Sequence, residues 1–244
     1  MRRLVHFTSL HSTNTYAKQW ASKSTPIYST AILADYQRHG RGRGDNLWTA
    51  DAGKNLTVSF THPKLRIRDI EALRVHFLFA LNLFRALKTL DLNISIKWPN
   101  DLMLGDKKIA GILSEVQHDA SGDSLLFIGL GLNVCQEDFG SLNDKVTSIQ
   151  HALSQTITVQ QALKITWDAF EKTVEEASDI DLASICEEIN HHLYAKDKQV
   201  AITQGQQTTN GALLGLHHDG RITLRNNDGT IQYLAAGNLL VSPC

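Results

Sequence analysis

The sequence has few cysteines and no long apolar run. Cys135, Cys186 and Cys244 are odd in number and far apart, which argues against a disulfide framework and favours a reducing compartment. No apolar stretch approaches the ~20 residues of a membrane-spanning helix. The segment from Met1 to Phe7 becomes polar too early for a signal peptide. We therefore expect a cytoplasmic protein with no membrane partner.

An excess of charge of either sign is also absent. The 24 basic and 25 acidic residues give a formal net charge of −1, which provides no general attraction to nucleic acids or anionic membranes. Any recognition of an anion must therefore be local. The 244 residues, 42% of them hydrophobic, suffice for one large domain and a small one around a substantial core.

The most distinctive stretch is a short alternation of glycine and arginine after an apolar run. Gly40, Gly42 and Gly44 alternate with Arg41 and Arg43. Glycine carries no Cβ, so the backbone N–H groups of such a loop can approach a ligand, and arginine forks around carboxylates and phosphates. The pattern matches neither the Walker loop nor G-x-G-x-x-G. It indicates either a loop that encloses an anion or a solvated glycine-rich loop.

Hydrophobic periodicity predicts strands and helices in mixed order up to about residue 194. The expected strands cover Leu4–Phe7, Ala31–Ala34, Asn55–Thr61, Ile94–Trp98, Leu102–Leu104, Lys107–Leu113 and Leu125–Val134. The expected helices run from Ser12-Thr13-Asn14 to Ala21 and over Asp69–Leu90, Thr158–Ala177 and Asp181–His192. Gly105-Asp106 suits a two-residue II′ hairpin. The core stripe of the longest helix should comprise Leu73, Phe77, Ala80, Leu81, Phe84 and Leu87.

Two polar or glycine-rich segments each have two interpretations. Ser12-Thr13-Asn14 precedes a helix, so capping is the simpler explanation of these side chains, although groups at a helix start can also face a ligand. Gly129 and Gly131 lie in a buried strand, where glycine permits either close packing or ligand contact.

Beyond residue 194 the sequence changes to short strands separated by turn signals. The expected strands are Gln199–Thr203, Gln207–Leu216, Arg221–Leu224 and Thr230–Leu234. They indicate a small β-barrel domain, so we divide the chain into residues 1–194 and 195–244.

Polar groups at or near strand ends are mostly cations and neutral hydrogen-bonding groups. They include Ser12, Thr13, Asn14, Gln37, Arg41, Arg43, Lys97, Asn100, Asp101, Lys108 and Asn133. Such a set suits a carboxylate held beside a polyphosphate. Two unit charges ~4 Å apart repel by about 4 kcal/mol at an effective dielectric of 20, and arginine, lysine and Mg²⁺ would offset that repulsion. A product anhydride would need a loop that closes and excludes water.

Five motifs, taken in their order along the chain, resemble those of biotin protein ligases. Ser12-Thr13-Asn14 is similar to the family's S-T-N segment, and Gly40-Arg41-Gly42-Arg43 to its G-R-G-containing adenylate-binding loop. Lys97 to Asp101 reproduces its K-W-P-N-D motif unaltered. Lys108 to Leu113 resembles K-x-A-G-I-L, and Gly129 to Val134 resembles G-I-G-I-N-V. The resemblance covers nearly the whole chain.

The resemblance implies an α+β fold: a catalytic domain like that of class II aminoacyl-tRNA synthetases, with a mixed sheet and helices, followed by an SH3-like β-barrel. It also implies a ligase that uses ATP to form biotinyl-5′-AMP. The biotin would then pass to a lysine of a biotin carboxyl carrier protein domain. Mg²⁺ is the implied metal, and Asp101 is the residue that would hold it. The sequence is compatible with a monomer or a homodimer.

Roles for individual residues follow from the same resemblance. Biotin would be bound by Ser12, Thr13, Asn14, Gln37, Gly40, Arg41 and Gly111. ATP and the adenylate would be bound by Arg41, Gly42, Arg43, Trp48, Asn100, Lys108 and Asn133. The catalytic residues would be Lys108, Arg41, Arg43 and Asp101, with Lys108 between the biotin carboxylate and the phosphate and Trp48 over the adenine.

The chain departs from the family pattern at three places. Gly44-Asp45 stands where the loop usually continues Arg-Gly, which places an acid near the anion. No lysine or arginine follows Arg225, so the terminal barrel should add no cation. Eleven residues precede Ser12, and we expect no helix-turn-helix domain and no DNA partner. A lipoate–protein ligase of the same fold and a non-catalytic binding scaffold are the alternative functions.

Overall fold

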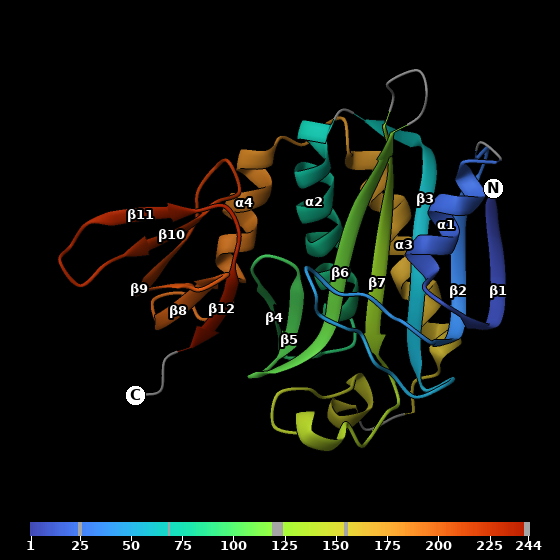
Figure 1. Cartoon of the computed structure of the whole chain (residues 1–244), viewed down its shortest axis with the longest axis horizontal. Coiled ribbons are helices and arrows are strands. Elements are labelled where there is room, and N and C mark those ends of the chain that lie inside the picture. Colours follow the sequence, from blue (N-terminus) through green and yellow to red (C-terminus); the bar gives the residue numbers. More distant parts are fainter. Residues whose placement is uncertain (24–25, 68, 119–123, 154–155, 242–244) are drawn as a thin grey trace.

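The computed structural model describes residues 1–23, 26–67, 69–118, 124–153 and 156–241. Two sheets organise the chain (Figure 1). The larger has seven strands in the order β1-β2-β3-β7-β6-β5-β4. Strands β1 and β2 pair in parallel, and the other neighbours are antiparallel. The architecture is thus a mixed α+β fold, as the sequence predicted.

The strands of the larger sheet agree with the predicted segments, but several are longer. They are β1 (Arg2–Leu10), β2 (Ser29–Gln37), β3 (Asn55–Ile67), β4 (Ile94–Lys97), β5 (Asp101–Leu104), β6 (Lys107–His118) and β7 (Ser124–Asn133). The link at Gly105-Asp106 is confirmed: Leu104 pairs with Lys107, and Gly105 has a φ of +57°. Glycine, which has no Cβ, adopts that conformation at little cost.

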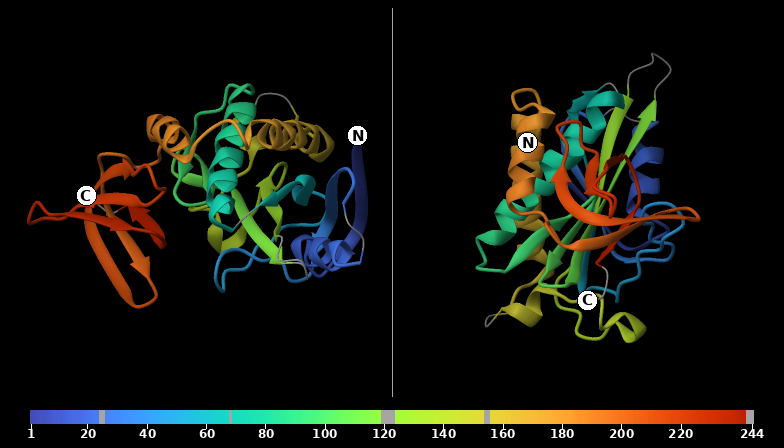
Figure 2. Two further views of the ribbon diagram at one scale, coloured as in Figure 1. Left: turned by 90° about the horizontal axis from the view of Figure 1, so that it is seen from above. Right: turned by 90° about the vertical axis from the view of Figure 1, so that its left-hand side faces the viewer.

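Side-chain alternation along the strands gives the larger sheet two different faces. On one face, Leu33 of β2 and Ile128 of β7 belong to the main core. On the other, Ile32 and Phe127 pack with Ala17 in a small cluster. Helix α1 (Thr13–Ala21) covers this second face, while α2 (Asp69–Lys88) and α3 (Val159–Glu176) cover the first (Figure 2).

The predicted core stripe of α2 is confirmed except at its first position. Five of the six predicted residues are buried, whereas Leu73 is 42% exposed. Leu73 lies two residues before the buried Val75 and faces the turn at Gly220, where a Cβ would lie 3.0 Å from its Cδ2. It therefore contacts the second sheet instead of the core.

The second sheet follows α4 (Leu182–His191) and lies beside the edge of the larger one (Figure 1). Its strands are β8 (Gln199–Gln204), β9 (Gln207–Leu216), β10 (Ile222–Arg225), β11 (Ile231–Leu234) and β12 (Asn238–Val241). They pair antiparallel in the order β11-β10-β9-β8-β12. Strand β12 was not predicted, and closure of these strands into a barrel stays a prediction. Among the described helices, none is long and apolar enough to cross a membrane.

Candidate active site

A cleft of about 660 Å³ lies on the α1 face of the larger sheet, and we call it the main cleft. The twelve predicted site residues on its wall are Ser12, Thr13, Asn14, Gln37, Arg41, Gly42, Arg43, Trp48, Asn100, Asp101, Lys108 and Gly111. They come from the start of α1, the end of β2, the glycine loop, the K-W-P-N-D turn and β6. The structure therefore brings together segments that are up to about a hundred positions apart in the chain.

The glycine loop folds as a small hairpin at this cleft. Arg41 and Leu47 form an isolated bridge, the Gly42 N–H donates to Asn46 O at 2.7 Å, and the Trp48 N–H donates to Gly40 O at 2.9 Å. The loop brings the Trp48 side chain down onto the sheet. A Cβ on Gly131 would lie 2.2 Å from Trp48 Cε2, and one on Gly111 would lie 3.3 Å from Trp48 Cζ3.

The glycines of β7 permit close packing, but with side chains of the cleft wall and not with a neighbouring strand. Gly129 and Gly131 alternate with buried leucines and face the α1 side of the sheet, and Gly131 pairs with Gly111 of β6. Gly131 makes room for Trp48, and a Cβ on Gly129 would lie 2.7 Å from Asn14 Oδ1. Both glycines admit side chains that line the main cleft.

The capping interpretation of Ser12-Thr13-Asn14 is wrong in its chemistry. Ser12 occupies the N-cap position of α1 but makes no capping hydrogen bond with its side chain. The hydroxyl group of Thr13 donates to Gln37 Oε1 at 3.1 Å, and Asn14 Nδ2 donates to Leu113 O at 3.1 Å. These side chains point toward the sheet and tie α1 to the walls of the cleft.

Lys108 and Asp101 form an ion pair at the centre of the cationic side of the cleft. Lys108 Nζ lies 2.7 Å from Asp101 Oδ1 and 5.7 Å from the centre of the Trp48 ring. Lys97 also lines the cleft, and burial lowers the pKa of its ammonium group, with Asp101 opposing that shift and Lys108 adding to it. Two ammonium groups, of Lys97 and Lys108, and the carboxylate of Asp101 thus lie close together in the cleft.

The K-W-P-N-D turn is fixed by hydrogen bonds to β6 and to the turn between β9 and β10. Asn100 Nδ2 donates to Ile112 O at 3.0 Å, and the Ile112 N–H donates to Asn100 O at 2.8 Å. Trp98 is buried, and its indole N–H donates at 3.2 Å to Gly220 O, in the turn between β9 and β10. Asp101 is therefore presented from a rigid support.

A second cleft of about 560 Å³ begins on the other side of Trp48. The two clefts share Gln37, Leu47, Trp48 and Lys108 in their walls. The predicted site residues Gly40 and Asn133 line only this second cleft. Asn133 is buried, and its Nδ2 donates to Thr147 O at 3.0 Å. The segment around Phe139 and Leu142 forms the opposite wall.

The loop arginines are already engaged by protein groups. Arg41 Nη2 lies 2.5 Å from Glu115 Oε2, and Arg43 Nη1 donates to Gly237 O at 3.4 Å. Burial lowers the pKa of Arg43, and Asp101 opposes that shift. Sequence reasoning missed Glu115 and Gly237. Glu115 follows Gly111 and Leu113 at a spacing of two on β6, and this alternation was the signal that could have found it.

Asp101 is the only predicted metal-binding residue. Within the described ranges, no three His, Cys, Asp or Glu side chains are grouped so that they could hold a metal ion. Mg²⁺ is commonly held by one or two carboxylates together with substrate phosphates. One oxygen of Asp101 pairs with Lys108, and a carboxylate has a second oxygen that can take a cation.

The sequence is similar to those of known ligases. The chain is 27% identical to the bifunctional ligase/repressor BirA of Bacillus subtilis over 93% of this chain and 71% of that protein. It is 26% identical to the biotin–[acetyl-CoA-carboxylase] ligase of Paracoccus denitrificans over 82% of this chain and 86% of that protein. The match to BirA of Escherichia coli, 33% identical, spans 43% of this chain and 32% of that protein.

Solved structures share the fold. The biotin protein ligase from Aquifex aeolicus in complex with biotin and ATP superposes with a TM-score of 0.83 at 22% identity, over 98% of this chain and 99% of that one. The Leishmania major enzyme in complex with biotinyl-5-AMP gives a TM-score of 0.64 at 21% identity, over 96% and 99%. The model of the Biotin/lipoate A/B protein ligase family matches residues 6–133, which is more than half of the sequence, and the chain belongs to that family.

Proposed function

We propose that this chain is a biotin protein ligase, which joins biotin to AMP and then transfers biotin to a lysine of a biotin carboxyl carrier protein domain. The observation that carries the proposal is the junction of two clefts at Lys108 and Trp48. One cleft would hold biotin, and the other would hold the adenosine part of ATP. The relatives named above are biotin ligases, which supports this choice within the family.

In the first step, a biotin carboxylate oxygen attacks the α-phosphorus of ATP, and the bond to the pyrophosphate oxygen breaks. Both reactants are anionic, and at ~4 Å their repulsion amounts to about 4 kcal/mol at an effective dielectric of 20. Lys108 borders both clefts, so its ammonium group can contact the carboxylate and the phosphate together. Asp101 orients that ammonium group through the 2.7 Å ion pair.

In the second step, the neutral amine of the acceptor lysine attacks the anhydride carbonyl, AMP leaves, and the amine loses a proton. The mixed anhydride would hydrolyse in open water, so the glycine loop and Trp48 must cover it. Asp101 would also hold Mg²⁺ with the triphosphate, and the metal would supply positive charge at the phosphates.

Ser12, Thr13, Asn14, Gln37 and Gly111 would hold biotin within the main cleft, and Asn133 would lie on the nucleotide side. We also propose a catalytic domain over residues 1–194, of the class II aminoacyl-tRNA synthetase type, and an SH3-like barrel over residues 195–244. The sequence motifs and the two separate sheets support this division.

Biotin-dependent exchange of pyrophosphate into ATP tests the proposal. We expect exchange with biotin and none with lipoate, and Lys108→Ala should reduce it by about 100-fold or more, as loss of a preorganised charge does. Lys164→Ala, which removes an exposed lysine on α3, is the matched control. Exchange with lipoate instead of biotin would assign the chain to the lipoate ligases, and no exchange with either would favour a binding scaffold.

A further inference from the structure

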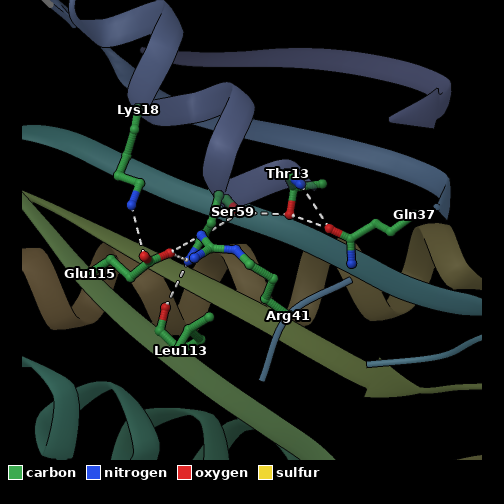
Figure 3. Close-up of polar contacts among 8 residues, drawn as sticks. Thr13, Lys18, Gln37, Arg41, Ser59, Leu113 and Glu115 are labelled. Atoms are coloured by element: carbon green, nitrogen blue, oxygen red, sulfur yellow. Dashed lines mark hydrogen bonds and ion pairs between the residues drawn. The ribbon is translucent and has the colours of Figure 1, made fainter. Parts of the chain in front are cut away.

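Glu115 gathers partners from two other segments around one carboxylate on β6. Its oxygens accept from Lys18 Nζ of α1 at 2.7 Å, from Asn14 Nδ2 at 2.8 Å and from Arg41 Nη2 of the glycine loop at 2.5 Å (Figure 3). The side chain is 19% exposed. Ion pairs of this kind are less screened by solvent than those on an open surface.

The carboxylate is held in its charged form. Burial alone would raise the pKa of Glu115, but hydrogen bonds from Lys18, Asn14 and Arg41 outweigh burial and place the pKa below its ordinary value. Removal of the charge would leave two cations beside each other. Such a carboxylate stabilises the arrangement that brings Lys18 and Arg41 together.

A chain of hydrogen bonds connects Glu115 to the predicted biotin-binding groups. Asn14 Oδ1 accepts from Ser59 Oγ at 2.5 Å, and Ser59 Oγ lies 2.8 Å from Thr13 Oγ1. The Thr13 hydroxyl donates to Gln37 Oε1 (Figure 3). The orientation of these groups therefore depends on the position of Asn14, which Glu115 holds.

The loop reaches the larger sheet through two side chains. Trp48 lies on Gly131, and Arg41 reaches Glu115. The Arg41 side chain is still 38% exposed, so its guanidinium group is not held there by burial. The contact with Glu115 is the ionic tie between the loop and β6.

We propose that Glu115 is a positioning residue that clamps the glycine loop, Gly40 to Trp48, over the main cleft through Arg41. On the proposed function, this clamp sets how long the adenylate is retained, and Glu115 itself acts only through Arg41 and does not touch the reacting atoms. Glu115→Gln removes the charge and keeps the shape of the side chain. It should speed release of biotinyl-AMP by about tenfold or more and raise the KM for biotin. The kcat of pyrophosphate exchange should stay within a few-fold of wild type.

The experiment uses two measurements on the full chain. The first is the rate at which preformed biotinyl-AMP appears in a filtrate, and the second is the rate of tryptic cleavage after Arg41 and Arg43. Both should rise in Glu115→Gln, and neither should change in Glu175→Gln, which alters an exposed carboxylate on α3. Glu115→Asp, which restores the charge on a shorter arm, should recover part of the loss.

Each outcome decides the proposal. Unchanged loop cleavage in Glu115→Gln would overturn the clamp. Faster cleavage with unchanged adenylate release would overturn its role in retention. If wild type shows no exchange, the proposed function fails, while the cleavage rates still decide the clamp. Should Glu115→Gln not fold, Arg41→Met removes the same ion pair from the loop side, with cleavage after Arg43 as the readout.

Discussion

The indole ring of Trp48 lies on Gly131, so close that a Cβ on Gly131 would fall 2.2 Å from Trp48 Cε2. The position of a Cβ is fixed by the backbone, so no side-chain rotation could relieve this overlap. Any side chain at position 131 must therefore displace the Trp48 ring. Because Trp48 separates the two clefts, that displacement changes both of them.

Gly131→Ala should therefore lower biotin-dependent exchange by about 100-fold, the size of effect that an ångström of misplacement has on a reacting site. The Trp48→Ala variant should lose activity as well, and the double variant should lose no more than the worse single variant, because both changes act on one contact. Additive losses would show that Gly131 acts through something other than Trp48. Exchange kinetics of the four proteins are the measurement.

Asp101→Asn tests whether this carboxylate orients Lys108 or also holds Mg²⁺. The amide keeps the shape but loses the charge that pairs with Lys108 Nζ at 2.7 Å. We expect kcat for exchange to fall about 10- to 100-fold, as it does when an orienting partner is removed. A metal role predicts that half-maximal activity also shifts to higher Mg²⁺ concentration. An unchanged Mg²⁺ dependence would leave orientation of Lys108 as its function, and Asp179→Asn, at the surface, is the control.

Local patterns were sufficient to predict most of the fold. Strands such as β3 and β7 carry apolar side chains at every position on the core face, and the buried residues of α3 recur with the helical period. The hydrophobic pattern is therefore enough to predict the type and approximate position of these elements. The motif resemblance also placed twelve residues that line one cleft. Strand β12 escaped because its sequence, Asn-Leu-Leu-Val, shows no alternation of apolar and polar residues, although Leu239 is buried and Leu240 is 52% exposed.

The contacts that organise the site could not be predicted in the same way. The partner of Arg41 lies 74 positions later, and no local spacing relates Arg41 to Glu115. Sequence reasoning assigned Arg41 and Arg43 to the anion, which stays a prediction, and it did not foresee that their guanidinium groups reach Glu115 and the Gly237 carbonyl. Which charged side chains far apart in the sequence come together depends on how the strands pair in the sheet. Such a pair can be predicted only after the strand register is known.

Cys186 should be nearly inert toward alkylating reagents in the native protein. It is 1% exposed, and burial raises the pKa of its thiol to about 11. At pH ~8 the reactive thiolate is then about a thousandth of the total. Mass spectrometry after brief treatment with iodoacetamide should find Cys186 labelled only after unfolding. Rapid native labelling would mean that α4 opens locally. Cys244 lies outside the described residues.

His76 of α2, which is partly buried, should make stability depend on pH. Its Nε2 lies 3.0 Å from Pro99 O, which can only accept, so the neutral ring carries its proton there. Its Nδ1, 2.8 Å from Ser114 Oγ, then accepts from that hydroxyl. Burial lowers the pKa of His76, and the nearby Arg43 lowers it further, while the Pro99 carbonyl and Asp101 oppose the shift.

The sign follows from the lowered pKa. Above about pH 6.5 the ring is neutral in both the folded and the unfolded chain, so its contribution to stability is complete. As the pH falls from 6.5 through the folded-state pKa, the unfolded chain binds the proton first. The free energy of unfolding should then decrease by up to about 1.4 kcal/mol per pH unit. His62 and His192 also have lowered pKa values and act in the same direction.

His76→Gln isolates this contribution, because glutamine can still donate to the Pro99 carbonyl and has no titration in this range. Urea denaturation of both proteins between about pH 7 and pH 5 gives the comparison. The free energy of unfolding of the variant should fall less steeply with acid, with the two curves converging as the pH drops. Parallel curves would show that the folded and unfolded chains bind the same number of protons at His76, and would overturn the lowered pKa of this ring as a source of acid sensitivity.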